Sequence, residues 1–137
     1  AVALADEPRW LSAEAVVALN REEAEALGEP HRIVDRAALE VALKRPWNVW
    51  VYFMDRDFAT LAMSLLVAIA GARAFAAANE RTAYRAALAL LETDGFAIDL
   101  GGSREHAEAQ LFDYFRGRLS QAGVRAWFET WATSAAR

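Results

Sequence analysis

Arginine and asparagine side chains gather in one short segment of the sequence, residues 71–85. Arg73 precedes a stretch with helical spacing, and Asn79, Arg81 and Arg85 lie near the start of that stretch. Free N–H groups at a helix N-terminus attract anions, and guanidinium groups bind phosphate well. These residues predict a phosphate-binding cradle. The alternative is that Asn79 is an ordinary helix cap and that the arginines pair with nearby carboxylates or solvent.

Other side chains capable of acid–base or metal chemistry are few. The chain has no Cys and two His, so thiolate zinc sites are excluded and no metal site is predicted. His31 lies by a turn and His106 in the first turn of an expected helix. Both are candidates for a substitute general base, although such positions are typical of surface histidines. Asp55 and Asp57 are expected to be solvated or to cap a helix.

The most aromatic stretch reads Pro-Trp-Asn-Val-Trp-Val-Tyr-Phe-Met over residues 46–54. Apolar side chains fall on both faces of an alternating pattern, which predicts a short strand or flap packed on the core at residues 47–54. The alternative is an exposed surface in which Trp47, Trp50 and Tyr52 bind a protein partner, because Trp and Tyr are enriched at interfaces.

Helices are expected to position these residues, because the chain has 32 Ala against 7 Gly and 3 Pro. Spacing, caps and stops predict helices over residues 13–27 (cap Ser12), from Asp35 to before Pro46, over 58–72, 80–94 (cap Asn79), 104–119 (cap Ser103) and 121–132, with an extended piece at 96–100. The uncharged stretch 58–72 is shorter than the roughly 20 residues of a membrane span and is expected to be a central helix covered on all sides. The fold predicted is an all-α, single-domain bundle of about six helices over residues 1–137.

The net charge of the chain indicates which classes of partner it can bind. Lys and Arg number 15 against 19 Asp and Glu, a net charge of −4, so direct binding to nucleic acid is not expected. Residues 1–9 lack the basic and apolar regions of a signal peptide, and no membrane segment is predicted.

The run Phe75-x-x-Ala78-Asn79-x-Arg81-Thr82-Ala83 is followed by an Ala/Leu-rich helix and a stop at Asp94-Gly95. It resembles the signature His-x-Phe-x-Asp-Ala-Asn-Lys-Arg-Thr-Ala of the death-on-curing toxin branch of the Fic/Doc (Fido) superfamily. The lead-in Trp10-Leu11-Ser12 and the segment from Asp35-Arg36 to Arg45-Pro46 are also similar. The likeness extends over residues 10–100.

The resemblance implies a Fido fold, a phosphate site and a cytoplasmic location. In intact members, phosphate or AMP passes from ATP, with Mg²⁺, to a protein hydroxyl. Elongation factor Tu is the target in the toxin branch, and a small antitoxin protein packs against the toxin. By resemblance, Phe75 anchors the loop, and Asn79 and Arg81 hold phosphate groups.

Three positions depart from the signature. Arg73 replaces the His that acts as general base, Ala77 replaces the acidic residue, and Glu80 replaces the Lys. Arginine stays protonated, alanine offers no carboxylate to Mg²⁺, and a glutamate repels a triphosphate. We therefore expect a toxin of a bacterial toxin–antitoxin module, or a degenerate relative of one, with its transfer activity lost or strongly impaired. The alternatives are an active enzyme with a rearranged site and a non-catalytic protein-interaction module.

Overall fold

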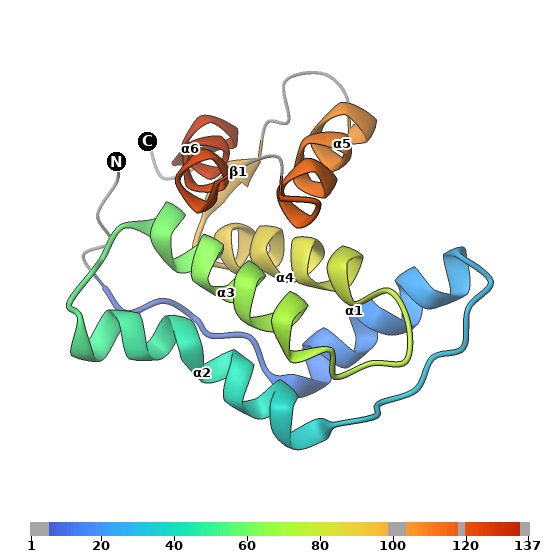
Figure 1. The fold of residues 1–137 in the computed structure, drawn as a ribbon. Coiled ribbons are helices and arrows are strands. Elements are labelled where there is room, and N and C mark those ends of the chain that lie inside the picture. The colour runs from blue at the N-terminus through green and yellow to red at the C-terminus, as the bar shows by residue number, and fades with distance from the viewer. Residues whose placement is uncertain (1–5, 99–103, 118–119, 135–137) are drawn as a thin grey trace.

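A computed structural model describes residues 6–98, 104–117 and 120–134 of the chain. The described part has six helices and two short strands (Figure 1). In chain order they are α1 (Ala13–Ala26), α2 (Arg36–Tyr52), α3 (Phe58–Ala72), α4 (Asn79–Thr93), β1 (Phe96–Ile98), α5 (Arg104–Phe115), α6 (Gln121–Trp131) and β2 (Ala132–Ser134). The predicted all-α class is confirmed. The strands form one antiparallel pair in which Phe96 lies opposite Ser134.

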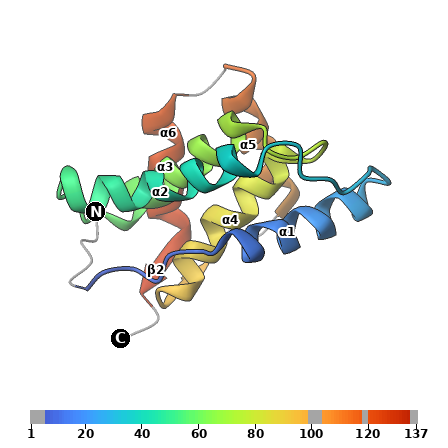
Figure 2. The ribbon, with the colours of Figure 1, turned by 90° about the horizontal axis from the view of Figure 1, so that it is seen from below.

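Helix α3 lies at the centre of the bundle and contacts α2, α4 and α6 (Figure 1). Its buried side chains form most of the core's middle layer: Phe58, Ala59, Leu61, Ala62, Leu65, Leu66, Ile69 and Ala70. Helices α1 and α4 pack together on the side seen in Figure 2. The expectation that α3 is covered on all sides is wrong, because Met63, Val67 and Ala68 are only half-buried.

Helix α2 is longer than the sequence predicts. It was expected to end before Pro46, which lacks a backbone N–H, but it continues through Pro46 to Tyr52. Pro46 and Trp50 lie one turn apart and are both buried. Burial of a large aromatic ring offsets the roughly 3 kcal/mol cost of proline in a helix. The predicted strand or flap at residues 47–54 is therefore wrong.

Most of the predicted helix starts and stops are confirmed. Side-chain oxygens of Ser12, Asp35 and Asp57 accept backbone N–H groups of Ala15, Ala38 and Thr60. Gly28 and Gly95 follow α1 and α4 with φ values of 69° and 88°, a conformation that glycine adopts without strain. The expected cap Ser103, the helix end at Leu119 and the second half of the extended piece at 96–100 lie outside the described residues.

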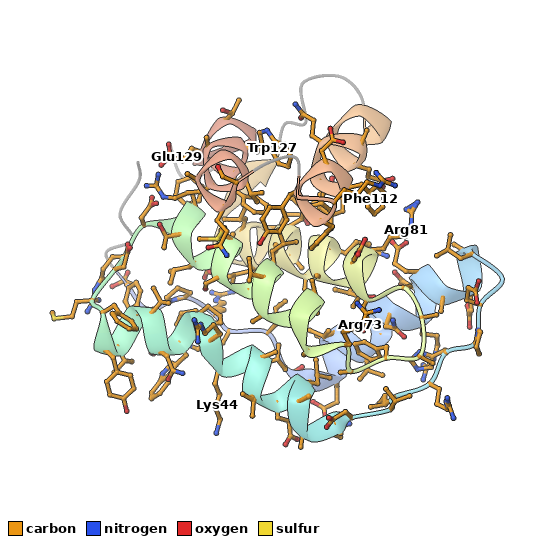
Figure 3. All side chains as sticks on the ribbon, viewed as in Figure 1. Lys44, Arg73, Arg81, Phe112, Trp127 and Glu129 are labelled. Atoms are coloured by element: carbon orange, nitrogen blue, oxygen red, sulfur yellow. The ribbon has the colours of Figure 1, made fainter. Side chains whose placement is uncertain are left out.

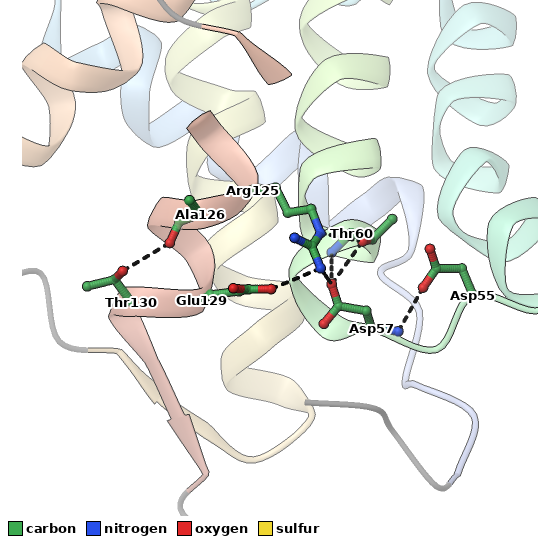
Figure 4. A network of polar contacts seen from close by, with 7 residues as sticks. All are labelled: Asp55, Asp57, Thr60, Arg125, Ala126, Glu129 and Thr130. Atoms are coloured by element: carbon green, nitrogen blue, oxygen red, sulfur yellow. Dashed lines mark hydrogen bonds and ion pairs between the residues drawn. The ribbon is translucent and has the colours of Figure 1, made fainter. Parts of the chain in front are cut away.

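Helix α6 is fixed to the start of α3 by Arg125. Its Nη2 lies 2.7 Å from Asp57 Oδ2 and 2.9 Å from Glu129 Oε1, and its Nε donates to Thr60 Oγ1 at 2.9 Å (Figure 4). One guanidinium thus joins the cap of α3 to a turn of α6. No helix in the described part of the chain has the length and apolar character needed to cross a bilayer.

Candidate anion-binding site

The loop between α3 and α4 carries the residues of the predicted phosphate cradle. Arg73 follows α3 with φ 48°, and Ala78 precedes α4 with φ 60°. Both are left-handed conformations, which cost a residue with a Cβ about 1 kcal/mol or more. Contacts elsewhere in the loop must therefore hold this geometry.

The side chain of Asn79 supplies two of those contacts. Its Oδ1 accepts the backbone N–H of Phe75 at 3.1 Å, and its Nδ2 donates to the Phe75 carbonyl at 2.8 Å. Asn79 is the first residue of α4, and the N-cap residue is Ala78, with no side-chain cap bond. The prediction that Asn79 caps the helix is wrong, because its amide is bound to the loop instead. One hydrogen of Nδ2 remains for a ligand.

Asn20 of α1 holds the same loop from the other side. It is fully buried, and its Nδ2 donates to the Ala77 carbonyl at 2.8 Å and to Thr82 Oγ1 at 3.0 Å. Its Oδ1 lies 2.9 Å from His31 Nδ1, and this oxygen can only accept, so Nδ1 must carry the proton. Sequence reasoning missed Asn20. Its position midway between buried Val16 and Ala24, at four-residue spacing, was the available signal.

The segment before α2 pairs with the loop through its backbone. Val34 N–H donates to the Ala74 carbonyl at 2.7 Å, and Ala76 N–H donates to the Arg32 carbonyl at 2.9 Å. The Phe75 side chain between them is buried in the core, 3 % exposed, where the resemblance placed it. The loop is thus fixed by α1, by the segment before α2 and by its own Asn79.

A pocket of about 330 Å³ opens beside this rigid loop at the start of α4. It is lined by Leu27, Arg73, Ala76, Ala77, Ala78, Asn79, Glu80, Arg81 and Phe112. The structure therefore brings together the motif positions Arg73 and 77–81, whereas Phe75, Thr82 and Ala83 are buried and do not line the pocket. His31 does not line the pocket, and the side chain of His106 lies outside the described residues.

Arg73 and Arg81 are the two cationic residues among the described residues that line the pocket (Figure 3). Arg73 is exposed and has no hydrogen bond or ion pair with the described residues. Arg81 lies 3.3 Å from Glu108 Oε2 of α5, and its guanidinium carbon is 5.7 Å from the centre of the Phe112 ring. An anion entering the pocket would meet one free guanidinium and one that is already paired.

Arg85 does not belong to this pocket, so the predicted cradle of three arginines is wrong. Its Nη1 lies 2.7 Å from Glu22 and 3.3 Å from Glu23, both on α1. Burial by itself lowers the pKa of Arg85, but the hydrogen bonds and charges of these two carboxylates outweigh it and raise that pKa. The carboxylates of α1 therefore bind Arg85 one turn further along α4, outside the pocket.

The chemistry available in the pocket is anion binding. Helix α4 presents its N-terminal N–H groups without a side-chain cap, and Arg73 and Arg81 add positive charge. Ala77 lines the pocket without a carboxylate, and the described residues contain no cluster of three or more His, Asp or Glu that could hold a metal ion. Among the described residues that line the pocket, Glu80 is the one that carries a carboxylate.

The aromatic residues predicted to bind a partner lie elsewhere. Trp50 is only 5 % exposed and packs edge-on against Trp10, with ring centres 6.3 Å apart, so the expectation that it forms part of an exposed surface is wrong. Trp47 is half-buried and contacts Tyr52, which is 71 % exposed. This segment precedes α3 and the pocket follows it, so about 22 Å of helix separates them.

The chain matches no protein-family model, and a search of curated proteins gives no significant match. The likeness to the Fic/Doc superfamily therefore rests on the residues quoted from the sequence.

Proposed function

We propose that this chain is a death-on-curing-like Fido protein of the bacterial cytoplasm that retains an anion pocket and has lost transferase activity. The observation that carries the proposal is the motif loop. Arg73 and Arg81 line one pocket at an uncapped helix N-terminus, beside a loop that Asn79 and Asn20 hold in place. Such a pocket suits a phosphate group or another small oxyanion.

The loss of transfer follows from the same residues. Arg73 cannot accept a proton from a target hydroxyl at neutral pH. Ala77 leaves Mg²⁺ without a carboxylate, and Glu80 repels the charge of a triphosphate. Loss of a general base alone lowers a rate by about 10² to 10⁴. Under this proposal intact relatives use ATP and Mg²⁺, whereas this chain uses neither. Its remaining partner is an antitoxin-like protein.

The direct test is incubation of the purified chain with elongation factor Tu and ATP labelled at either the α- or the γ-phosphate. An intact family member in a parallel reaction is the positive control. We expect no label on elongation factor Tu or on the chain. Label transfer at a rate close to that of the control would refute the loss of activity and favour an enzyme with a rearranged site.

A second candidate function is protein interaction without catalysis, favoured by the apolar end of α2. Tyr52, Phe53 and Met54 are 71 %, 77 % and 70 % exposed. Single apolar residues are common on protein surfaces, but contiguous exposed ones often mark a binding site. Growth after expression tests both proposals. Toxicity that Arg81→Ala abolishes would support an active enzyme and contradict the loss of transferase activity, whereas toxicity that only Phe53→Ser abolishes supports the interaction module.

A further inference from the structure

Four consecutive apolar side chains are exposed where α2 ends. Among the described residues, seven large apolar side chains are exposed, and four of them are Val51, Tyr52, Phe53 and Met54, which we call the apolar tip. Helix α2 packs against α3 and lies along one edge of the bundle, so the tip projects from that edge (Figures 1 and 2). The hydrophobic effect favours any partner that removes such a patch from water.

The side chains of the tip point in different directions. Tyr52 is the last residue of α2, Phe53 is its C-cap, and Met54 has a φ of 52°. Successive side chains on a helix are about 100° apart, and the left-handed residue turns the chain again. A protein surface contacts one side of such a tip, whereas a fluid lipid layer can surround all of its side chains.

Backbone and ring contacts hold the tip in shape. The Asp55 N–H donates to the Val49 carbonyl at 3.3 Å, and the Asp57 N–H donates to Asp55 Oδ1 at 3.0 Å. The guanidinium carbon of Arg56 lies 3.9 Å from the centre of the Trp50 ring. A fixed turn therefore presents the apolar side chains, and binding through it loses little backbone entropy.

Basic side chains lie close to the tip. Residues 44–56 carry three basic side chains against one acidic side chain, whereas the whole chain has a net charge of −4. Lys44 and Arg45 are exposed and have no hydrogen bond or ion pair with the described part of the chain, and Lys44 points away from the bundle (Figure 3). Arg45 precedes Tyr52 by seven residues, or about 10 Å along α2. A headgroup layer is about 5–8 Å thick, so these long side chains can reach lipid phosphates when the tip enters the layer.

We propose that the apolar tip enters an anionic lipid surface, with Lys44 and Arg45 bound to the lipid phosphates. Tyrosine is enriched where apolar and polar layers meet, and Tyr52 lies at the base of the tip. Buried apolar area and attraction to anionic lipids add in such peripheral binding. The inference goes beyond the anion pocket, whose described lining residues are distinct from the tip. It also differs from the second candidate function, because the partner is lipid and not protein.

The test uses vesicles of two compositions, phosphatidylcholine alone and phosphatidylcholine with phosphatidylglycerol in equal parts. Cosedimentation with sucrose-loaded vesicles measures the bound fraction of the full chain. We expect the mixed vesicles to bind the chain about tenfold more tightly than phosphatidylcholine alone, or more, because two basic side chains face the anionic surface. Raising the salt concentration should reduce this difference.

Variants of the chain locate the contact. Phe53→Ser should weaken binding to the mixed vesicles about tenfold or more, and Arg45→Gln about fivefold. The matched controls, Val34→Ser and Arg21→Gln, change one exposed apolar and one exposed basic side chain elsewhere and should leave binding unchanged. Met54→Gly replaces Phe53→Ser if the latter does not fold, because glycine adopts a φ of 52° without strain.

A fluorescent label reports insertion directly. The chain has no Cys, so Phe53→Cys provides a single thiol for an environment-sensitive fluorophore. Its emission should shift to the blue when mixed vesicles are added. The same label on Val34→Cys should not shift.

The lipid proposal fails if the mixed vesicles do not bind the chain, or if both compositions bind it equally. It also fails if Phe53→Ser and Met54→Gly both leave binding intact, or if the label at position 53 does not shift. Loss of vesicle binding in Arg81→Ala would assign the lipid phosphate to the anion pocket instead. A dimer that Phe53→Ser dissociates would assign the tip to a second copy, and Phe53-dependent toxicity without vesicle binding would assign it to another protein. Each of these three results overturns the proposal.

Discussion

The guanidinium of Arg81 lies 3.3 Å from the carboxylate of Glu108, so one cation of the anion pocket is already paired with a carboxylate of α5. The two side chains are 31 % and 23 % exposed, which places the pair between a surface and a buried ion pair. Any phosphate that binds Arg81 must share the guanidinium with Glu108 or displace it. The strength of this internal pair therefore limits the affinity of the pocket.

Removing the charge of Glu108 should strengthen anion binding. A partly exposed ion pair is worth about 0.2–1 kcal/mol, so Glu108→Gln is expected to tighten phosphate binding by about 1.5- to 5-fold in calorimetry. The matched control is Glu22→Gln, which removes one of the two carboxylates that pair with Arg85 outside the pocket and should leave phosphate binding unchanged. Equal effects of the two variants would indicate only a change in net charge.

The central polar residue Asn20 should make a large contribution to stability. Asn20→Ala leaves the Ala77 carbonyl, the Thr82 hydroxyl and the His31 Nδ1–H without their partner, which is expected to cost about 2–4 kcal/mol of the free energy of unfolding. Urea denaturation measures the change. Asn48→Ala, at a half-buried position with no hydrogen bond among the described residues, should change stability by about 0.5 kcal/mol or less. Similar losses in both variants would contradict the role assigned to Asn20.

The sequence predicted the helices well because their signals are local. The caps at Ser12, Asp35 and Asp57 and the stops at Gly28 and Gly95 depend on neighbouring residues alone. The errors arose where distant contacts decide the structure. Pro46 stays inside α2 because it is buried with Trp50 against the core, and periodicity cannot report that burial.

The same distinction applies to the candidate site. The motif spacing correctly placed Arg73, Asn79 and Arg81 around one loop. It could not assign Arg85, whose direction is set by Glu22 and Glu23 on α1, more than 60 residues earlier in the chain. It also gave Asn79 the wrong bond, because a helix cap and a bond to Phe75 are equally compatible with the sequence.

The pH dependence of stability should include a contribution from Asp94. Burial raises the pKa of Asp94, although the Arg9 N–H, a donor at 2.8 Å, acts in the opposite direction. A raised folded-state pKa means that folding disfavours the ionised form, so this group lowers stability as the pH rises above the pKa of the unfolded state. The negative charge also lies at the C-terminus of α4, where the helix dipole opposes it.

Asp94→Asn should therefore raise the free energy of unfolding at pH 7, by less than about 1 kcal/mol because the group is partly solvated. The amide oxygen can still accept the Arg9 N–H. The gain should vanish below pH 3.8, the ordinary pKa of an aspartate, where Asp94 is protonated in both the folded and the unfolded state. Denaturation at pH 7 and at low pH checks the sign, and a loss of stability at pH 7 would refute it.

Restoring the three altered motif positions should recover part of the transferase activity. Arg73→His, Ala77→Asp and Glu80→Lys all lie on the pocket wall, outside the core, so the fold should survive. His also tolerates the left-handed conformation at position 73 better than most residues. Transfer of labelled phosphate or AMP measures recovery, and Arg73→His alone should recover much less. A folded triple variant without ATP binding or transfer would favour the interaction module.

The most direct test of the central claim is calorimetry of the unmodified chain with inorganic phosphate and with ATP–Mg²⁺. We predict that phosphate binds, that Arg73→Ala and Arg81→Ala each weaken this binding, and that Arg85→Ala does not. We predict that ATP–Mg²⁺ binds more weakly than a Kd of about 10 μM, or about −7 kcal/mol, because Glu80 repels it and Ala77 offers no metal ligand. Tighter binding of ATP–Mg²⁺, or phosphate binding that Arg81→Ala leaves unchanged, would contradict the account.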